Sequence, residues 1–406
     1  MSDTLPRDAA RPVPPEAAED DVLVRVDKLV KHFPVRGGGL IRRTVGQVQA
    51  VDGVSLVVRR GQTLGLVGET GCGKSTLARC IAGLIPVTSG TVTFEGRNIT
   101  NLSRRAMQPF RREIQMIFQD PYGSLNPRRR VGAIIGDPFA VHKTAKGAAR
   151  KKAVQELMER VGLNPEHFNR FPAEFSGGQR QRIGVARALA LRPKLIICDE
   201  PVSALDVSIQ AQVLNLLADL QSDFGLSYLF IAHDLEVVRH VSNDVTVMYL
   251  GRVAESGPKD QVYETSRHPY TAALLSAAPA ADPDAAAERR RIILTGDVPS
   301  PINPPDGCRF HPRCPKAQEL CGQQEPVLEV KPGDPATHLT ACHFPVQAGE
   351  SLARVAGRDR RCASAHWSSR PPRPSRRPSR RSRAAASGSS PGAGYCTTRW
   401  PSPPSW

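Results

Sequence analysis

One eight-residue segment limits the possible folds of this chain more strongly than any other part of the sequence. It follows an apolar run, Leu64–Val67, and precedes a helical pattern from Ser75 to Leu84. A strand, a glycine-rich turn and a helix in this order open a βαβ unit. The glycines let backbone N–H groups turn inward around a phosphate, and the helix dipole favours an anion there. The segment therefore predicts a nucleotide phosphate site, and it reads Gly68-Glu69-Thr70-Gly71-Cys72-Gly73-Lys74-Ser75.

Charged and hydroxyl side chains add specific chemistry to this site. Lys74 contributes a point charge, and the Ser75 hydroxyl can bind Mg²⁺ at the start of the helix. A later apolar run, Leu195–Cys198, ends in Asp199 and Glu200. Carboxylates at the carboxyl end of a parallel strand lie where α/β folds bind ligands. Asp199 suits Mg²⁺, and Glu200 can polarise an attacking water. Such a segment alone is more often only a strand end, but downstream of a phosphate loop a catalytic role is favoured.

Other apolar runs indicate a parallel sheet. Tyr228–Ala232 and Val245–Leu250 are continuous apolar runs between helical segments, which is typical of parallel strands buried on both faces. Val22–Val30 and Ala50–Val58 alternate apolar and polar residues, as half-buried strands do. A polar, helical stretch occupies about 120–180. We therefore expect an α/β fold.

A second candidate anion site opens a later helix, expected from Ile183 to Leu191. Ser176 can cap this helix, and the glycines that follow leave backbone amides bare. If both helix starts served one nucleotide within one chain, a monomer would be enough. The segment reads Ser176-Gly177-Gly178-Gln179-Arg180-Gln181-Arg182.

Five motifs occur in the order seen in ABC-transporter ATPases, and the chain resembles that family. They are the phosphate loop, Ser-Gly-Gly-Gln-Arg, the apolar run with Asp-Glu, Ser203-Ala204-Leu205-Asp206, and His233 after a strand. The resemblance implies a P-loop NTPase domain of the ABC type, with an antiparallel β subdomain and a helical subdomain. It also implies that two subunits enclose two ATP molecules, and that the Ser-Gly-Gly-Gln segment of one completes the phosphate loop of the other. A homodimer or heterodimer is therefore expected.

The same resemblance implies roles for single residues. Glu200, Gln119 and His233 are the expected catalytic residues: Gln119 senses Mg²⁺ and the attacking water, and His233 contacts the γ-phosphate. Phe33 is expected to stack on adenine, although a lone aromatic near a strand end is as often core packing. His233 could instead be a polar residue that closes a strand. The remaining implied roles are ATP contacts at Gly68, Glu69, Thr70, Gly71, Cys72, Gly73, Lys74, Ser75 and Thr76; Mg²⁺ ligands at Ser75, Gln119 and Asp199; a signature acting in trans at Ser176, Gly177, Gly178 and Gln179; and a dimer-communication loop at Ser203, Ala204, Leu205 and Asp206.

Four further segments resemble the ATPases of dipeptide, oligopeptide and nickel importers, and this resemblance covers residues 22–345. The last of the four is similar to the second, F-type, ATPase subunit of such systems. Thr70 stands where many relatives have serine, but it keeps the hydroxyl. The segments are Phe118–Arg128, Phe171–Phe175, His268–Ala277 and Pro299–His311.

The resemblance implies a subunit that hydrolyses ATP with Mg²⁺ and energises peptide import, with nickel, glutathione or another solute as the alternative cargo. Expected partners are a paralogous ATPase subunit or a second copy, two transmembrane permeases and, indirectly, an extracytoplasmic solute-binding protein, but no nucleic acid. The chain is then expected at the cytoplasmic face of the inner membrane, bound peripherally. A non-transport ABC ATPase acting on nucleic acid or ribosomes is disfavoured because it would not need the importer segments. An iron–sulfur electron-transfer protein is disfavoured because it would not need the ATP site.

Four cysteines lie close together in the sequence near the C-terminal end of the importer-like region. Their C-x₅-C-x₆-C-x₂₀-C spacing matches no standard zinc or ferredoxin pattern. Four thiolates could hold a [4Fe–4S] cluster, or Zn²⁺ with help from histidines at 311, 338 or 343, or they could be free thiols. The resemblance favours the cluster, which would staple a small domain with little core. The cysteines are Cys308, Cys314, Cys321 and Cys342.

The expected organisation has four parts: a disordered leader at 1–21, an ATPase domain at 22–265, a C-terminal domain at 266–345 and a basic tail at 346–406. The net charge of +16 is concentrated in the tail, where residues 350–406 hold twelve arginines and no lysine against two acidic residues. Clustered arginine could tether anionic lipid or nucleic acid, but an unselected extension is favoured. No apolar run reaches the 18–20 residues that span a bilayer, and residues 1–21 do not form a signal peptide.

Overall fold

The computed structural model describes residues 21–36, 44–277 and 291–352. These residues belong to one compact unit that ends at Arg354. The expected leader, apart from its last residue, and the tail from residue 353 onward lie outside the described residues.

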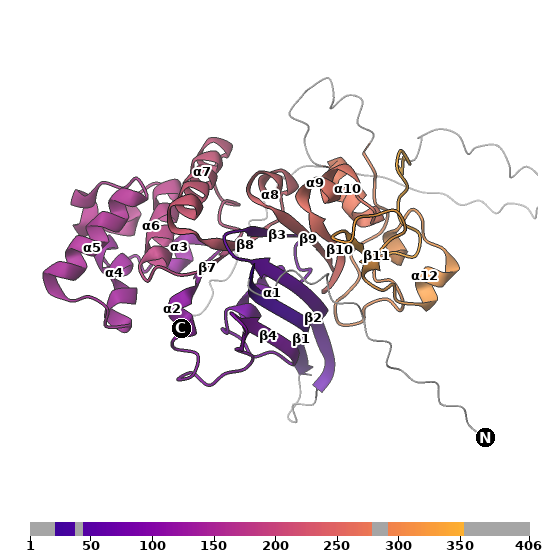
Figure 1. The fold of residues 1–406 in the computed structure, drawn as a ribbon, viewed down its shortest axis with the longest axis horizontal. Coiled ribbons are helices and arrows are strands. Elements are labelled where there is room, and N and C mark those ends of the chain that lie inside the picture. The colour runs from indigo at the N-terminus through magenta and orange to yellow at the C-terminus, as the bar shows by residue number, and fades with distance from the viewer. Residues whose placement is uncertain (1–20, 37–43, 278–290, 353–406) are drawn as a thin grey trace, which may run out of the picture. The chain divides into compact units, whose positions relative to one another are not determined.

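An antiparallel sheet of four strands contains the two alternating segments (Figure 1). Its central strand β1 buries Leu23, Val24, Val26 and Leu29 and turns polar residues outward. Both expected strands are present and are longer than the alternation alone predicts. In spatial order the strands are β2 Thr44–Arg59, β1 Val22–Arg36, β4 Ser89–Phe94 and β5 Arg97–Asn98.

A second, eight-stranded sheet has a parallel core and an antiparallel extension. The continuous apolar runs form the parallel strands, as expected, and every residue of β3, β7 and β8 is buried. The parallel strands in spatial order are β9 Asp244–Tyr249, β3 Thr63–Val67, β8 Ser227–Ala232, β7 Leu195–Asp199 and β6 Ile114–Ile117. The extension beyond β9 consists of β10 Arg252–Pro258, β12 Leu339–Thr340 and β11 Glu329–Val330.

Alternate residues of the parallel strands belong to two separate cores. Leu229 and Ile231 of β8 pack with α1 and the antiparallel sheet, whereas Tyr228 and Phe230 pack with the helices on the opposite face. Because both faces are covered by apolar partners, the strand sequence is apolar at every position. Figure 1 shows α1 (Lys74–Ile81) and α8 (Leu235–Val241) on opposite sides of the sheet.

A helical region follows β6 and includes most of the stretch expected near 120–180. Val131, Ile135, Val154, Met158 and Ile183 are almost wholly buried where its helices meet. The helices between β6 and β9, other than α8, are α3 Pro121–Ser124, α4 Val131–Val141, α5 Gly147–Arg160, α6 Gly177–Leu189 and α7 Val207–Phe224, with 3₁₀ turns η2 Pro165–Asn169 and η3 Pro172–Glu174. A short helix, α2 Phe110–Glu113, precedes β6.

The start of α6 corrects one expectation from the sequence. The helix begins at Gly177 and not at Ile183, so the glycine-rich run forms its first turn. The reason is a capping box: the Gln179 N–H donates to Ser176 Oγ at 3.3 Å, and the Ser176 N–H donates to Gln179 Oε1 at 3.0 Å. Two otherwise unpaired donors are thereby satisfied, which compensates for the poor helix propensity of glycine.

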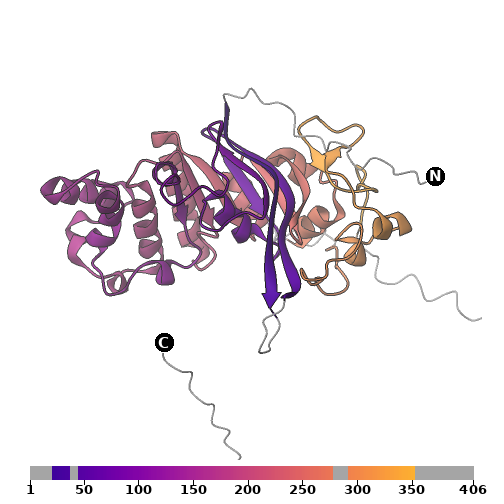
Figure 2. The same cartoon turned by 90° about the horizontal axis from the view of Figure 1, so that it is seen from below.

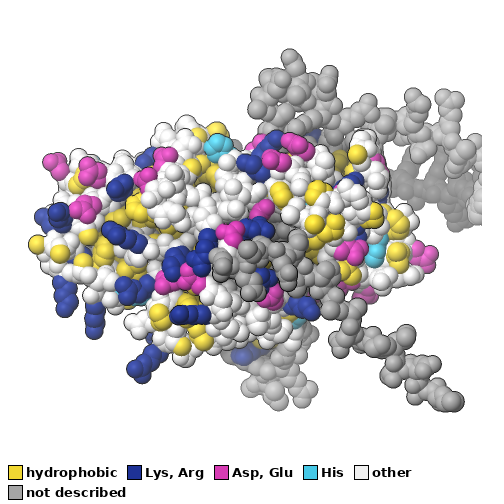
Figure 3. Space-filling model, viewed as in Figure 1, with side chains coloured by type: hydrophobic (Ala, Val, Ile, Leu, Met, Phe, Trp, Pro, Cys, Tyr) yellow, Lys and Arg dark blue, Asp and Glu magenta, His cyan; other side chains and the backbone are white. Residues whose placement is uncertain are grey.

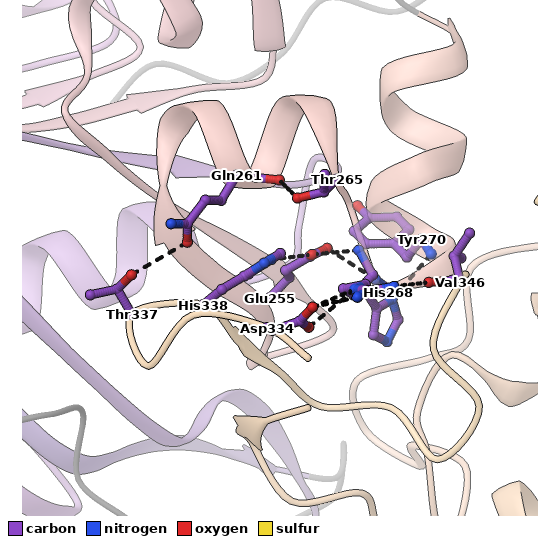
Figure 4. A network of polar contacts seen from close by, with 10 residues as sticks. Glu255, Gln261, Thr265, His268, Tyr270, Asp334, Thr337, His338 and Val346 are labelled. Atoms are coloured by element: carbon purple, nitrogen blue, oxygen red, sulfur yellow. Dashed lines mark hydrogen bonds and ion pairs between the residues drawn. The ribbon is translucent and has the colours of Figure 1, made fainter. Parts of the chain in front are cut away.

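The C-terminal region, here residues 259–277 and 291–352, continues the larger sheet through the pairing of β10 with β12. In Figure 2 its orange to yellow segments lie at the end of the described fold that is away from the helical region. A buried polar network fixes this region, with the Glu255 carboxylate at its centre (Figure 4). Glu255 accepts hydrogen bonds from the backbone N–H groups of Arg267 and His268 and contacts His338 Nε2 at 2.8 Å. The elements of this region are α9 Lys259–Glu264, α10 Pro269–Ala277, η4 His311–Arg313 and α12 Glu319–Gln323.

The surface seen in Figure 3 carries Lys and Arg side chains interspersed with Asp and Glu. Among the helices of the described residues, none combines the length and the apolar character that a bilayer crossing requires.

Candidate nucleotide site

The phosphate loop joins β3 to α1 and can be formed only with glycine at two positions. Gly73 has φ +106°, and a Cβ there would lie 2.0 Å from the carbonyl oxygen of Ala50. At Gly68 a Cβ would lie 2.2 Å from the carbonyl oxygen of Met248. No real Cβ contact is so short, so any side chain at either position would displace the loop from the strands that support it.

Lys74 lies within this loop and is 4% exposed. Its Nζ donates to the carbonyl oxygens of Gly68 at 2.7 Å and Glu69 at 3.1 Å. Within the described part of the chain this ammonium contacts these two carbonyl oxygens and, at 3.9 Å, the Cys72 sulfur, so no carboxylate there competes with a phosphate. The loop therefore suits the triphosphate of a nucleotide.

Beside the loop, Ser75 and Asp199 form a pair of oxygen ligands. Ser75 Oγ donates to Asp199 Oδ1 at 2.7 Å. Asp199 is fully buried, and among the described residues its Oδ2 has no hydrogen-bond partner. Burial raises the pKa of the Asp199 carboxyl, although the Ser75 hydrogen bond and Arg79 act against this. The Arg79 guanidinium lies 4.0 Å from Oδ2, beyond hydrogen-bond distance. Oxygen atoms of this kind are what Mg²⁺ prefers, and a cation would coordinate the oxygen that lacks a hydrogen bond. The residues thus fit Mg²⁺.

The three expected catalytic residues lie together, although they are far apart in the sequence. Gln119 Nε2 donates to Glu200 Oε2 at 2.9 Å, and His233 Nδ1 lies 3.5 Å from the same oxygen. Each follows one of three adjacent parallel strands, β6, β7 and β8, whose carboxyl ends meet at one sheet edge.

The backbone of Glu200 is strained. Its φ of +47° is unusual for a residue other than glycine and costs about 1 kcal/mol or more. The strained conformation is held by the Glu200 N–H, which donates to the carbonyl oxygen of Ile231 at 2.9 Å, and by Ser203 Oγ, which donates to the Glu200 carbonyl oxygen at 3.1 Å. The side chain is thereby turned toward Gln119 and His233.

The signature segment Ser176–Gln179 lies at the start of α6, with the Ser176 and Gln179 side chains exposed. In Figure 1, α6 lies among α4 and α5, whereas α1 lies beneath the sheet on the other side of β7. Leu205 of the expected communication loop lies next to the signature: a Cβ added at Gly177 would be 3.4 Å from Leu205 Cδ2. Ser203, Ala204 and Asp206 are exposed.

Phe33 does not belong to the core. Its side chain lies on β1, is 38% exposed and carries the Lys31 ammonium 4.8 Å from its ring centroid. The alternative interpretation of Phe33 as core packing is therefore wrong, and its stacking on adenine stays a prediction.

Two residues of the C-terminal region contact the phosphate loop, and sequence reasoning missed both. Arg313 donates to both carboxylate oxygens of Glu69, at 2.8 and 3.2 Å, and the Glu69 N–H donates to the hydroxyl of Tyr270 at 2.9 Å. The sequence separations of 244 and 201 residues leave no local signal. In the sequence, Tyr270 stands out only as part of the segment His268–Ala277, which resembles the importer ATPases.

The four cysteines of the C-terminal region lie near one another. The pKa of the Cys314 thiol is raised to about 11 and that of Cys342 to about 12, mainly by burial and in smaller part by the neighbouring Cys308 and Cys321. All four are free. Among the described residues, however, no group of three or more His, Cys, Asp or Glu side chains has a geometry that could hold a metal ion. The expected iron–sulfur cluster therefore receives no support from the geometry.

Comparisons with known proteins match two parts of the chain to family profiles. Residues 51–203 match the ABC transporter family, and residues 254–321 match the family described as oligopeptide/dipeptide transporter, C-terminal region. The oligopeptide transport ATP-binding protein AppF of Bacillus subtilis is 52% identical over 329 residues, which cover 81% of this chain and 99% of AppF. The dipeptide transport ATP-binding protein DppF of Escherichia coli is 47% identical over 339 residues, covering 84% of this chain and 99% of DppF.

A similar fold occurs in a solved structure described as the dimeric, post-hydrolysis state of an ATP-binding cassette bound to ADP and phosphate. That chain is 25% identical, with a TM-score of 0.52, and the match covers 58% of this chain and 99% of the other. The shared part is thus an ATP-binding cassette.

Proposed function

Since this chain belongs to the ATP-binding subunits of the oligopeptide and dipeptide ABC transporters, we propose that it hydrolyses ATP to drive the import of peptides across the cytoplasmic membrane. The observation that carries this proposal is the convergence of Gln119 and His233 on Glu200, at the sheet edge where the buried Asp199 meets Ser75. Nickel, glutathione or another solute is the alternative cargo, but the names of the relatives favour peptides.

In this proposal the phosphate loop and Lys74 bind the β- and γ-phosphates of ATP. Mg²⁺, held by Ser75, Asp199 and Gln119, would neutralise charge on the phosphate oxygens. Glu200 is held by Gln119, so its carboxylate can accept a hydrogen bond from the attacking water. His233 is 54% exposed and lies beside Glu200, which leaves its imidazole available to the γ-phosphate.

We further infer that the active form is a pair of ATPase subunits, either this chain with a paralogue or two copies of it. Support comes from the exposed signature at Ser176 and Gln179, from the separation of α6 from α1, and from the dimeric cassette of similar fold. Two permease subunits would contact the pair at the cytoplasmic face of the inner membrane, and a solute-binding protein would deliver cargo from outside.

The test is peptide uptake by cells that lack the gene for this chain, with a labelled dipeptide and with Ni²⁺ as parallel substrates. We expect the gene to restore peptide uptake and a Lys74→Ala variant to fail. Restored Ni²⁺ uptake without peptide uptake would show that the cargo is nickel and not peptide. Peptide uptake by Lys74→Ala equal to that of the wild type would contradict the role of ATP.

The four cysteines of the C-terminal region remain a second candidate site. Their mutual proximity supports a cluster or zinc, whereas the lack of metal-ligating geometry among the described residues favours free thiols. Visible absorbance, metal analysis and thiol titration after anaerobic purification distinguish a cluster, zinc and free thiols. Colourless, metal-free protein with four titratable thiols would establish free thiols.

A further inference from the structure

The phosphate loop is held from outside by two side chains of the C-terminal region. We propose that Arg313 and Tyr270 are positioning residues for ATP binding, which act by fixing Glu69 and, through it, Lys74. This inference rests on the proposed ATPase function and adds a role for the C-terminal region in setting the affinity for ATP.

The contacts of Glu69 provide the physical link. Its carbonyl oxygen accepts hydrogen bonds from Lys74 Nζ at 3.1 Å and from the Cys72 N–H at 3.2 Å. Its carboxylate and its own N–H are held by Arg313 and Tyr270. Every polar group of Glu69 is thus engaged, on one side by the loop and on the other by the C-terminal region. Displacement of Glu69 would move a carbonyl that orients the Lys74 ammonium.

The C-terminal side of this link is rigid. Tyr270 is fully buried, and its ring packs against those of Tyr249 and Phe310, with centroids 4.7 and 5.3 Å away. The Tyr270 N–H donates to His268 Nδ1 at 3.1 Å, and the His268 N–H donates to the buried Glu255 carboxylate at 3.1 Å (Figure 4). The Tyr270 hydroxyl is therefore fixed by packing and by hydrogen bonds before ATP arrives.

The ion pair between Arg313 and Glu69 is sheltered as well as bidentate. The Arg313 side chain is 10% exposed and that of Glu69 is 26% exposed. Bidentate arginine–carboxylate pairs restrict orientation more than single contacts do. A loop restrained in this way loses less conformational entropy when it closes on phosphate, and affinity rises accordingly.

The experiment measures binding of a fluorescent ATP analogue, mant-ATP, to the full chain. The variants are Arg313→Met, Arg313→Lys and Tyr270→Phe. The matched control is Lys316→Met, because the Lys316 ammonium donates to the Pro345 carbonyl oxygen and to Glu350, both of which lie in the C-terminal region. We expect Arg313→Met to raise the Kd about tenfold and Tyr270→Phe to raise it severalfold. Arg313→Lys should recover part of the loss, and Lys316→Met should bind as the wild type does.

Steady-state kinetics supply a readout that a merely structural role would not give. The KM for ATP should rise in the Arg313 and Tyr270 variants with little change in kcat, since Glu200 is untouched. Combination of Arg313→Met with Glu69→Gln should weaken binding no more than the stronger single change, because both remove the same link.

Two outcomes separate this inference from the function on which it rests. Wild-type protein that fails to bind mant-ATP would contradict the proposed function. Wild-type binding with unchanged Kd in folded Tyr270→Phe and Arg313→Met variants would contradict the positioning role. Thermal unfolding curves show whether each variant is folded. If Arg313→Met does not fold, the Kd of Tyr270→Phe, which keeps the aromatic ring, tests the positioning role by itself.

Discussion

Gln119 Nε2 lies 2.9 Å from Glu200 Oε2, although the two residues are 81 positions apart in the chain. The contact exists because β6 and β7 are parallel neighbours, so the residues that follow them leave the sheet at the same edge. A carboxylate held in this way keeps its orientation without a bound nucleotide. The site is therefore largely formed before substrate arrives, and this leads to the predictions below.

Glu200→Gln should abolish turnover and preserve ATP binding. The amide retains the shape of the side chain but cannot act as a base toward water, so we expect kcat to fall by at least about a hundredfold. ATP-bound dimers should then accumulate in size-exclusion chromatography. Glu236→Gln, which changes an exposed carboxylate in the first turn of α8, is the control. ATPase turnover that survives Glu200→Gln would remove Glu200 from its assigned role.

Asp199→Asn should weaken binding of the Mg²⁺ complex of ATP. The change removes charge from a fully buried carboxylate whose Oδ2 accepts no hydrogen bond within the described residues. We expect the Mg²⁺ concentration at half-maximal ATPase activity to rise about tenfold or more. Asp244→Asn is the matched control. Asp244 begins strand β9, whereas Asp199 ends the parallel strand β7, and Asp244 pairs with Arg59 at 2.6 Å. Equal Mg²⁺ dependence in the two variants would contradict the assignment.

Ser176→Ala should separate dimer-dependent activity from binding by one subunit. Ser176 caps α6, and loss of such a cap costs about 1 kcal/mol. We expect ATPase activity to fall at least tenfold while mant-ATP still binds, because in our proposal Ser176 serves the partner's phosphate loop. Asn164→Ala removes a cap of similar kind from η2 and should leave the activity intact. If Ser176→Ala lost mant-ATP binding together with activity while Asn164→Ala kept both, Ser176 would serve the phosphate loop of its own subunit.

The buried imidazole of His268 should make the protein less stable in mild acid. Burial lowers its pKa from 6.5 to about 4, against the attraction of Glu255. Between these two values the unfolded chain binds a proton that the folded chain does not. Stability contributed by the neutral imidazole is therefore full above the unfolded pKa and is lost as the pH falls toward 4, by about 1.4 kcal/mol per unit of pKa difference.

The measurement is the Tm of the wild type and of His268→Gln across a pH series from about 7.5 to about 5. We expect the wild-type Tm to fall more steeply, because the variant has no imidazole at this position. Parallel curves would show that His268 does not titrate as its burial implies.

The sequence predicted the parallel strands and the sheet edge well because both depend on local patterns. Apolar runs of four to six residues between turn and helix signals indicate strands buried on two faces, and the carboxyl ends of parallel strands must meet at one edge. It did not predict the left-handed backbone of Glu200, which is held by Ile231 and Ser203 and not by a local preference. Nor did it predict the contacts of Arg313 and Tyr270 with Glu69, since residues more than 200 positions apart are brought together only by tertiary packing.

The start of α6 shows how one local rule can override another. Helix propensity disfavours two glycines in succession, but α6 begins with Gly177 and Gly178 and not at the expected Ile183. The reciprocal hydrogen bonds between Ser176 and Gln179 prevail because unpaired donors at a helix end cost more than glycine does.

The pairing of β10 with β12 bears on any attempt to excise the ATPase part as a separate protein. Truncation after Glu264 would strip the partner strand from Glu255 and Ser256 and leave their backbone groups at a bare sheet edge, a known cause of aggregation. It would also remove the partners of the Glu255 carboxylate, which are the backbone N–H groups of Arg267 and His268 and the imidazole of His338. A minimal soluble cassette would therefore need a redesigned edge along β10.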